Sequence, residues 1–194
     1  MARSKTFEPD EILREAMQVF WVYGFEGASM QQLLDAMQIC RQSLYDTFGD
    51  KRQLFLRALK LYDREQSKQR QALLNSEKSA RKALHKLFLG LAAETVEKRH
   101  RGCLMVKVVA EGLTSDDEAS AIIARNARSY RRSLQEVLAR GVADGEFPAS
   151  LAPGAGASEL FTVLQGRWVS AQSGASANTL RKSAQMALHT LEQK

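Results

Sequence analysis

The chain has 194 residues, of which 44% are hydrophobic and 26% are charged, a balance typical of a globular protein with a substantial core. No apolar run approaches the length of a membrane span, and the first residues lack the apolar stretch of a secretion signal, which argues against a membrane protein and a secreted one. Two cysteines, Cys40 and Cys103, do not form a disulfide framework, so we expect a protein of the reducing cytoplasm.

The positive charge is unevenly distributed along the chain. The net charge is +6, which permits a nucleic-acid partner but does not establish one. Residues 1–52 hold six Lys or Arg against eight Asp or Glu, whereas residues 53–101 hold twelve against five. Any phosphate contact made near the N-terminus must therefore come from a few well-placed cations.

The first predicted helix begins at Pro9, a residue that suits the first turn of a helix. Its apolar residues recur at helical spacing, and Gly24 and Gly27 are expected to end it. These apolar residues are Ile12, Ala16, Val19, Phe20 and Tyr23.

Two short helices follow, joined by a tight turn. The first starts at Ser29, a good N-cap, with Gln32 three residues later, as in a capping box. The second covers about residues 40–48, and Asp50 can cap a long helix over residues 51–75. Helices of about eight residues are marginal on their own, so this pair needs the first helix to pack against.

The rest of the chain also favours helices, which are expected near 79–97, 103–110, 156–172 and 176–192. Another is expected to start within the cap-rich stretch 114–118 and to carry an apolar stripe as far as Gly141. The branched residues of 103–110 could form a strand, but no second strand is available to pair with it, so a buried helix is favoured. Residues 144–157 are the clearest loop. We therefore predict an all-α fold of about nine helices.

One longer helix followed by two short ones matches the geometry of a helix-turn-helix domain. In that geometry the third helix, here residues 40–48, enters the major groove of DNA. Arginine suits guanine edges and glutamine suits adenine edges, while Ser, Thr and Tyr suit phosphate oxygens. The polar face of the last helix offers these residue types at Arg41, Gln42, Ser43, Tyr45 and Thr47.

The segment from Glu8 to Leu59 resembles the N-terminal domain of TetR-family regulators. The features that match are Gly24-Phe25, Ser29, the small and apolar second helix, and the run Leu44-Tyr45-x-x-Phe48-x-x-Lys51. Arg101-Gly102-Cys103-Leu104 is also similar to a motif that opens the sixth helix in one subgroup of that family.

The resemblance implies an all-α homodimer with a DNA-binding domain at 1–50 and an effector-binding and dimerisation domain at 51–194. It implies that Arg41, Gln42 and Ser43 face bases and that Leu44 and Phe48 belong to the core. The residues that it places near phosphates, or beside them on the DNA face, are Ser29, Met30, Tyr45, Thr47 and Lys51. Arg3 and Lys5, in the leading arm, are further candidates for DNA contact.

Two residues depart from the family pattern at the turn. Gln38 stands where a glycine is usual, and a positive φ there would cost about 1 kcal/mol, so the turn is expected to be either wider or strained. Cys40 stands where a small hydroxyl residue is common. It is either a redox switch beside the DNA or simply a small apolar residue, and the second interpretation is favoured.

The same resemblance implies a cavity for a small-molecule effector of unknown identity in the C-terminal domain. The apolar candidates for its wall are Phe88, Leu91, Cys103, Met105, Val109, Phe161 and Trp168. Ordinary core packing is the alternative for each of them. Cys103 with His100 gives only two possible metal ligands, so a buried thiol is favoured over a metal site. The cluster Arg128, Arg131 and Arg132 could bind an acidic effector, but a solvated helix face is favoured.

The last two predicted helices carry apolar stripes that could pack inward or against a second subunit. The resemblance favours a four-helix dimer interface, in which Gly166 would allow a close approach. The residues of the stripes are Leu160, Phe161, Leu164, Trp168, Leu180, Ala184, Leu188 and Leu191.

The sequence therefore predicts a ligand-responsive repressor that binds a palindromic operator on double-stranded DNA as a homodimer. The alternative is a helical ligand- or protein-binding module without DNA binding, which the negative charge of the first domain and Gln38 motivate. An enzyme is not favoured, because Asp116-Asp117-Glu118 fits a helix cap and no Glu-x-x-His motif occurs. No cofactor and no metal are expected.

Overall fold

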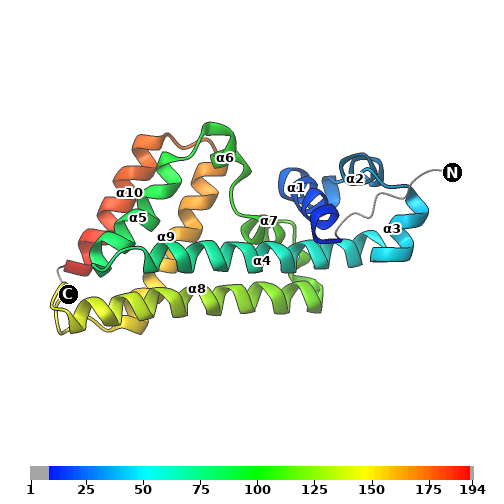
Figure 1. The fold of residues 1–194 in the computed structure, drawn as a ribbon. Coiled ribbons are helices and arrows are strands. Elements are labelled where there is room, and N and C mark those ends of the chain that lie inside the picture. The colour runs from blue at the N-terminus through cyan, green and yellow to red at the C-terminus, as the bar shows by residue number, and fades with distance from the viewer. Residues whose placement is uncertain (1–8, 193–194) are drawn as a thin grey trace.

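The computed structural model describes residues 9–192, and this part of the chain folds into α-helices and two short 3-10 turns without any strand (Figure 1). The all-α prediction is confirmed. The helices are α1 (Pro9–Gly27), α2 (Met30–Met37), α3 (Arg41–Phe48), α4 (Lys51–Asn75), α5 (Ala80–Ala93), α6 (Val96–Arg101), α7 (Leu104–Ala110), α8 (Asp117–Ala143), α9 (Pro153–Gln172) and α10 (Ala177–His189), with the 3-10 turns η1 (Leu113–Ser115) and η2 (Thr190–Glu192). Arg3 and Lys5 lie outside the described residues.

The helix predicted at 79–97 is divided in the structure, and this division accounts for one helix more than expected. α5 ends at Ala93, and α6 begins after Thr95, whose side chain accepts a hydrogen bond from the amide of Lys98. A threonine in this position is an N-cap, and it starts a new helix in place of extending the old one.

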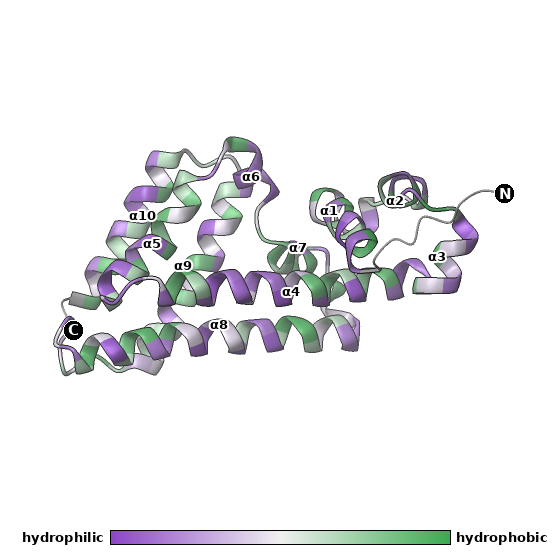
Figure 2. Cartoon of the chain, in the orientation of Figure 1, coloured by the Kyte–Doolittle hydropathy of each residue, from purple (hydrophilic) through white to green (hydrophobic). Residues whose placement is uncertain are grey.

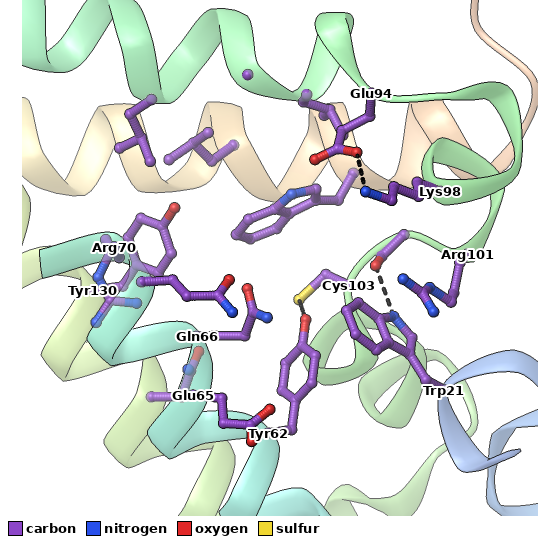
Figure 3. Close-up of a pocket in the computed structure, with 18 of the residues that line it drawn as sticks. Trp21, Tyr62, Glu65, Gln66, Arg70, Glu94, Lys98, Arg101, Cys103 and Tyr130 are labelled. Atoms are coloured by element: carbon purple, nitrogen blue, oxygen red, sulfur yellow. Dashed lines mark hydrogen bonds and ion pairs between the residues drawn. The ribbon is translucent and has the colours of Figure 1, made fainter. Parts of the chain in front are cut away.

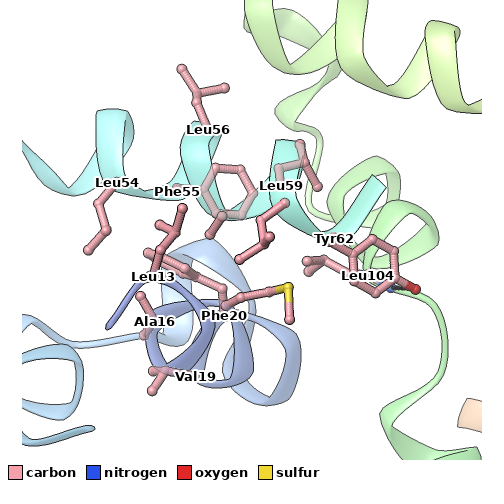
Figure 4. Close-up of a cluster of buried hydrophobic side chains, with 14 of the residues drawn as sticks. Leu13, Ala16, Val19, Phe20, Leu54, Phe55, Leu56, Leu59, Tyr62 and Leu104 are labelled. Carbon is pink, nitrogen blue, oxygen red and sulfur yellow. Dashed lines mark hydrogen bonds between the residues drawn. The ribbon is translucent and has the colours of Figure 1, made fainter. Parts of the chain in front are cut away.

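α1, α2 and α3 gather at one end of the molecule around the first turns of α4 (Figure 1). Their apolar faces enclose a core in which Phe20 packs edge-on against Phe55 of α4, with ring centroids 5.0 Å apart. Figure 4 shows this cluster and its continuation along α4 to Leu104 of α7. Asp50 caps α4 as predicted, but the core runs across the predicted boundary at residue 50 without interruption.

A second core lies at the opposite end, between α5, α8, α9, α10 and the end of α4. Here the apolar stripes of α9 and α10 face inward. Leu160, Leu164, Leu180, Ala184 and Leu191 are all buried within the single chain. These stripes are therefore not free to form the dimer interface that the resemblance favoured, since their own subunit already covers them.

α4 and α8 lie side by side and run in the same direction. Polar pairs join them at nearly constant sequence separations of 59 to 64 residues, which is the pattern of parallel neighbours. The pairs are Arg52 with Asp116, Asp63 with Arg125 and Asn126, and Arg70 with Ser129 and Ser133.

α7, which Figure 2 shows as largely hydrophobic, packs against α1, α4 and α9. It therefore touches both ends of the molecule. Within residues 9–192, no helix combines the length and the apolar character needed to cross a lipid bilayer.

Candidate DNA interface and effector cavity

The start of α2 is fixed by the predicted capping box. The amide of Gln32 donates to Ser29 Oγ at 3.1 Å, and the amide of Ser29 donates to Gln32 Oε1 at 2.8 Å. Two amides that the helix itself leaves without partners are satisfied in this way. The side chain of Ser29 stays exposed at the end of the molecule that α2 and α3 form.

The turn between α2 and α3 passes through a left-handed residue. Gln38 has φ 53° and ψ 40°, and it alone among the non-glycine residues described has a positive φ. Its amide donates to the carbonyl of Leu34, which closes α2. The strain that the missing glycine suggested is therefore present in the structure.

Replacing Gln38 with glycine should raise the free energy of unfolding by about 1 kcal/mol, because glycine adopts the left-handed conformation without a Cβ clash. Urea denaturation measures the change. The same substitution at Gln31, inside α2, is the matched control and should lower stability by about 1 kcal/mol. A loss of stability in the Gln38 variant would show that the turn is not strained.

α3 begins at Cys40, which makes no side-chain cap to the helix. Its exposed Sγ lies 3.1 Å from Ser43 Oγ, and this hydrogen bond lowers the pKa of the Cys40 thiol. The start of α3 is therefore held by packing of Leu44 and Phe48 in the core and not by a cap.

The five polar residues predicted for DNA contact all lie exposed on α3. Tyr45 is 46% exposed although it is aromatic, whereas Leu44 and Phe48 on the other side of the helix are buried. The side-chain nitrogen Nε2 of Gln42 donates to Asp46 Oδ1 at 2.8 Å, which orients the Gln42 side chain along the helix surface. The exposed side chains are Arg41, Gln42, Ser43, Tyr45 and Thr47.

Two further candidates flank this face. Lys51 is half-buried, with its ammonium 4.8 Å from the ring centroid of Phe25, and Met30 is half-buried at the start of α2. Arg57, which sequence reasoning missed, donates to the carbonyl of Thr47 at 3.1 Å. Arg57 lies in α4, ten residues beyond Thr47, so the local pattern of α3 does not reveal this cation.

A cavity of about 480 Å³ opens between α1, α4, α5, α6, α8 and α9 (Figure 3). Of the seven predicted wall residues, Leu91, Cys103 and Trp168 line it. Phe88, Met105 and Phe161 instead pack inside the two cores, and Val109 is exposed on the outer side of α7. Helical periodicity separates buried from exposed faces, but it does not separate a core from a cavity wall.

Several wall residues were missed by the sequence analysis because they come from distant segments. Trp21 of α1 donates from its ring nitrogen to the carbonyl of Gly102 at 2.9 Å. Tyr62 Oη lies 3.6 Å from Cys103 Sγ, and burial raises the pKa of both groups. Cys103 is therefore a protonated, buried thiol, as predicted.

The cavity reaches the DNA-binding end directly, because Met17, Gln18 and Trp21 of α1 form part of its wall. α7 also binds the end of α1. Lys107 Nζ donates to the carbonyls of Trp21 and Val22 at 2.8 and 2.7 Å, and the amide of Phe25 donates to Glu111 at 2.8 Å. Between these contacts Gly24 breaks the helix with φ 77° and ψ −178°. A break at Gly24 was predicted from the sequence. It leaves the carbonyls of Trp21 and Val22 without partners in the helix, and Lys107 donates to both of them.

Comparison with known proteins decides the family. Residues 12–58 match the model described as bacterial regulatory proteins of the tetR family, and residues 79–187 match the tetracyclin repressor-like C-terminal domain. The chain belongs to the tetR family. It is 34% identical to the HTH-type transcriptional repressor ComR of Escherichia coli strain K12, over 94% of this chain and 88% of ComR.

The chain is also similar to a second curated protein and to solved structures. The uncharacterised HTH-type transcriptional regulator YezE of Bacillus subtilis strain 168 is 33% identical over 75% of this chain and 76% of YezE. A cysteine variant of the TetR-family regulator CifR, solved in complex with 26-base-pair double-stranded operator DNA, is 32% identical with a TM-score of 0.82. That match covers 96% of this chain and 98% of CifR. The reduced form of NemR from Escherichia coli shares the fold at 21% identity, over 92% of this chain and 94% of NemR, with a TM-score of 0.82.

Proposed function

We propose that this TetR-family regulator is a ligand-controlled repressor that binds a palindromic operator as a homodimer. The observation that carries the proposal is the exposed polar face of α3, held by buried residues on its other side. Arginine and glutamine on this face suit base edges, and the hydroxyl residues suit phosphates. The protein acts by binding and not by catalysis, in the cytoplasm.

Release from DNA follows from the position of the cavity. Its wall includes residues of α1 and α4, so a ligand that prefers one arrangement of these helices shifts the two-state balance of the DNA-binding end. Operator affinity should fall when the cavity is filled. Tight ligand binding with unchanged operator affinity would refute this coupling.

The dimer requires a surface other than the predicted stripes. The outer face of α9 presents Ser158, Thr162, Gly166 and Ser170, one turn apart and all exposed. Each of the three hydroxyls donates to a carbonyl of its own helix, which leaves a smooth face with few free donors. A Cβ on Gly166 would meet nothing within its own chain, so only a second subunit gives this glycine a packing role. We assign the two-fold contact to this face.

DNA binding should respond differently to two classes of substitution. Lys51→Ala and Tyr45→Ala should weaken binding to operator and random duplexes alike, and Lys51→Ala should reduce the salt slope by about 1 per subunit. Gln42→Ala should cost about 1–3 kcal/mol on the operator and relax the preference at one base pair. Gel shifts across salt concentrations, on an operator selected from a random library, measure both effects.

Lys68→Ala is the matched control, because Lys68 is an exposed lysine further along α4. It should leave both the affinity and the salt slope unchanged. Equal losses on operator and random DNA for Gln42→Ala would contradict base reading. No binding at low salt would instead support a helical module without DNA function.

A further inference from the structure

α3 is attached to the rest of the protein by few contacts. It lies at the outer end of the molecule, where it leads into the first turn of α4 (Figure 1). Two of its side chains, Leu44 and Phe48, are buried in the core, but its start carries no side-chain cap. The turns on either side of it pass through residues of positive φ, 53° at Gln38 and 79° at Gly49. The orientation of α3 therefore depends on a small number of interactions.

Arg57 of α4 supplies the one side-chain hydrogen bond that joins α3 to another helix within residues 9–192. Its Nη1 donates to the carbonyl of Thr47 at 3.1 Å, and its guanidinium carbon lies 5.7 Å from the ring centroid of Phe48. The side-chain hydrogen bonds of Cys40 and Gln42 stay within α3 and its N-cap. Arg57 therefore contacts both of the last two residues of α3.

The C-terminal end of a helix suits this cation. The last four carbonyls of a helix lack partners within it, and the carbonyl of Thr47 is one of them. The helix dipole places partial negative charge at the same end, which favours a guanidinium there. Arg57 is exposed, so it forms this bond without the cost of burying a charge. The bond therefore favours one orientation of α3 relative to α4.

Base reading depends on this orientation more than phosphate binding does. A hydrogen bond to a base edge requires a side chain at a fixed position in the major groove, whereas phosphate contacts supply affinity without sequence information. Arg41 and Gln42 stand on the same short helix, so a tilt of its far end moves them as well.

We propose that Arg57 is a positioning residue, which holds α3 at the angle to α4 that base reading requires. The inference rests on the proposed function, because it takes α3 as the helix that reads bases. A direct contact with a phosphate is the competing role for an exposed arginine at this place. The hydrogen bond to Thr47 favours positioning, since it turns the guanidinium to the protein's own backbone.

Hydrogen exchange tests the contact in the full-length protein without DNA. In Arg57→Met, the backbone amides of residues 44–49 should exchange about five-fold faster, because the hydrogen bond that holds the end of α3 is lost. Arg64→Met is the matched control, since Arg64 is an exposed arginine two turns further along α4 and its ion pair with Asp10 does not involve α3. It should leave exchange in α3 unchanged. Equal exchange rates in the two variants overturn the inference.

Gel shifts on the selected operator and on random duplex give the ratio of the two affinities. Arg57→Met should lower this ratio about ten-fold, which is the discrimination that one good base contact supplies, and should leave the salt slope on random DNA unchanged. Arg57→Lys keeps a cation that can donate to the Thr47 carbonyl, and it should recover most of the ratio. Arg64→Met should keep the ratio of the parent. Circular dichroism should show all three variants folded, because none of them alters a buried residue.

The outcomes separate positioning from the other roles of Arg57. A salt slope lower by about 1 per subunit in Arg57→Met would make Arg57 a phosphate contact and overturn the positioning role. An unchanged ratio in Arg57→Met, or an Arg57→Lys protein no better than it, overturns the inference as well. If selection from a random library yields no preferred sequence for the parent protein, the proposed function fails, and this is recognised before any variant is compared.

Discussion

Replacing Gly24 with alanine should lower the free energy of unfolding by about 3 kcal/mol. At φ 77° and ψ −178° the backbone lies in a region that is open to glycine and strained for other residues by about 1–3 kcal/mol. A Cβ would also overlap the carboxylate of Glu111, which must then move and release the amide of Phe25. The contact between α1 and the segment that follows α7 would be weakened as well, because it includes this hydrogen bond.

Urea denaturation measures this loss as a lower midpoint with an unchanged slope. Gly27→Ala is the matched control, because Gly27 has no positive φ and its Cβ would meet only Tyr23 at an ordinary 3.7 Å. That variant should be as stable as the parent or slightly more stable, since alanine favours helix. If the two variants are equally stable, the close approach of Glu111 to α1 does not exist in solution.

Replacing Gly166 with glutamate should convert the dimer to monomers and lower operator affinity at least about a hundred-fold. A two-fold interface repeats each substitution, so two carboxylates would meet where the helices approach most closely, and like charges at an interface cost several kcal/mol. Monomers bind one half-site each and lose the combined affinity of two. Analytical ultracentrifugation and gel shifts measure the two effects.

Ala72→Glu adds the same charge on an exposed position of α4 and serves as the control. It should leave the dimer intact. Circular dichroism should show both variants folded, because a side chain at position 166 has open space in its own chain. A Gly166→Glu protein that remains dimeric would move the interface away from the outer face of α9.

The features that the sequence predicts best are those formed within a few residues. The capping box at Ser29 and the cap at Asp50 depend on neighbours three positions away, and both occur in the structure. Gln38 left a wider and a strained turn open, and the structure has the strained one. The exposed face of α3 follows from the spacing of Leu44 and Phe48. These features depend on local geometry, so they can be predicted without knowing how the rest of the chain packs.

The cavity could not be predicted in the same way. Trp21, Arg70 and Arg101 meet there only because α1, α4 and α6 converge, and their sequence neighbours give no sign of it. Periodicity correctly marked Phe88 and Phe161 as buried, but core and cavity wall have the same pattern. Periodicity also identified the apolar stripes of α9 and α10, but it could not show that other helices of the same subunit cover them.

The parallel pairing of α4 with α8 has a mechanical consequence. Arg52, Asp63 and Arg70 tie the two helices together near the DNA-binding end, at mid-length and beside the cavity, so the pair bends less than one helix alone. Arg70 lies about 28 Å along the axis from Lys51, at 1.5 Å per residue. A tilt of about 5° at the cavity then displaces Lys51 by about 2.5 Å over that lever arm. We expect a displacement of this size in each subunit to change how α3 fits the major groove.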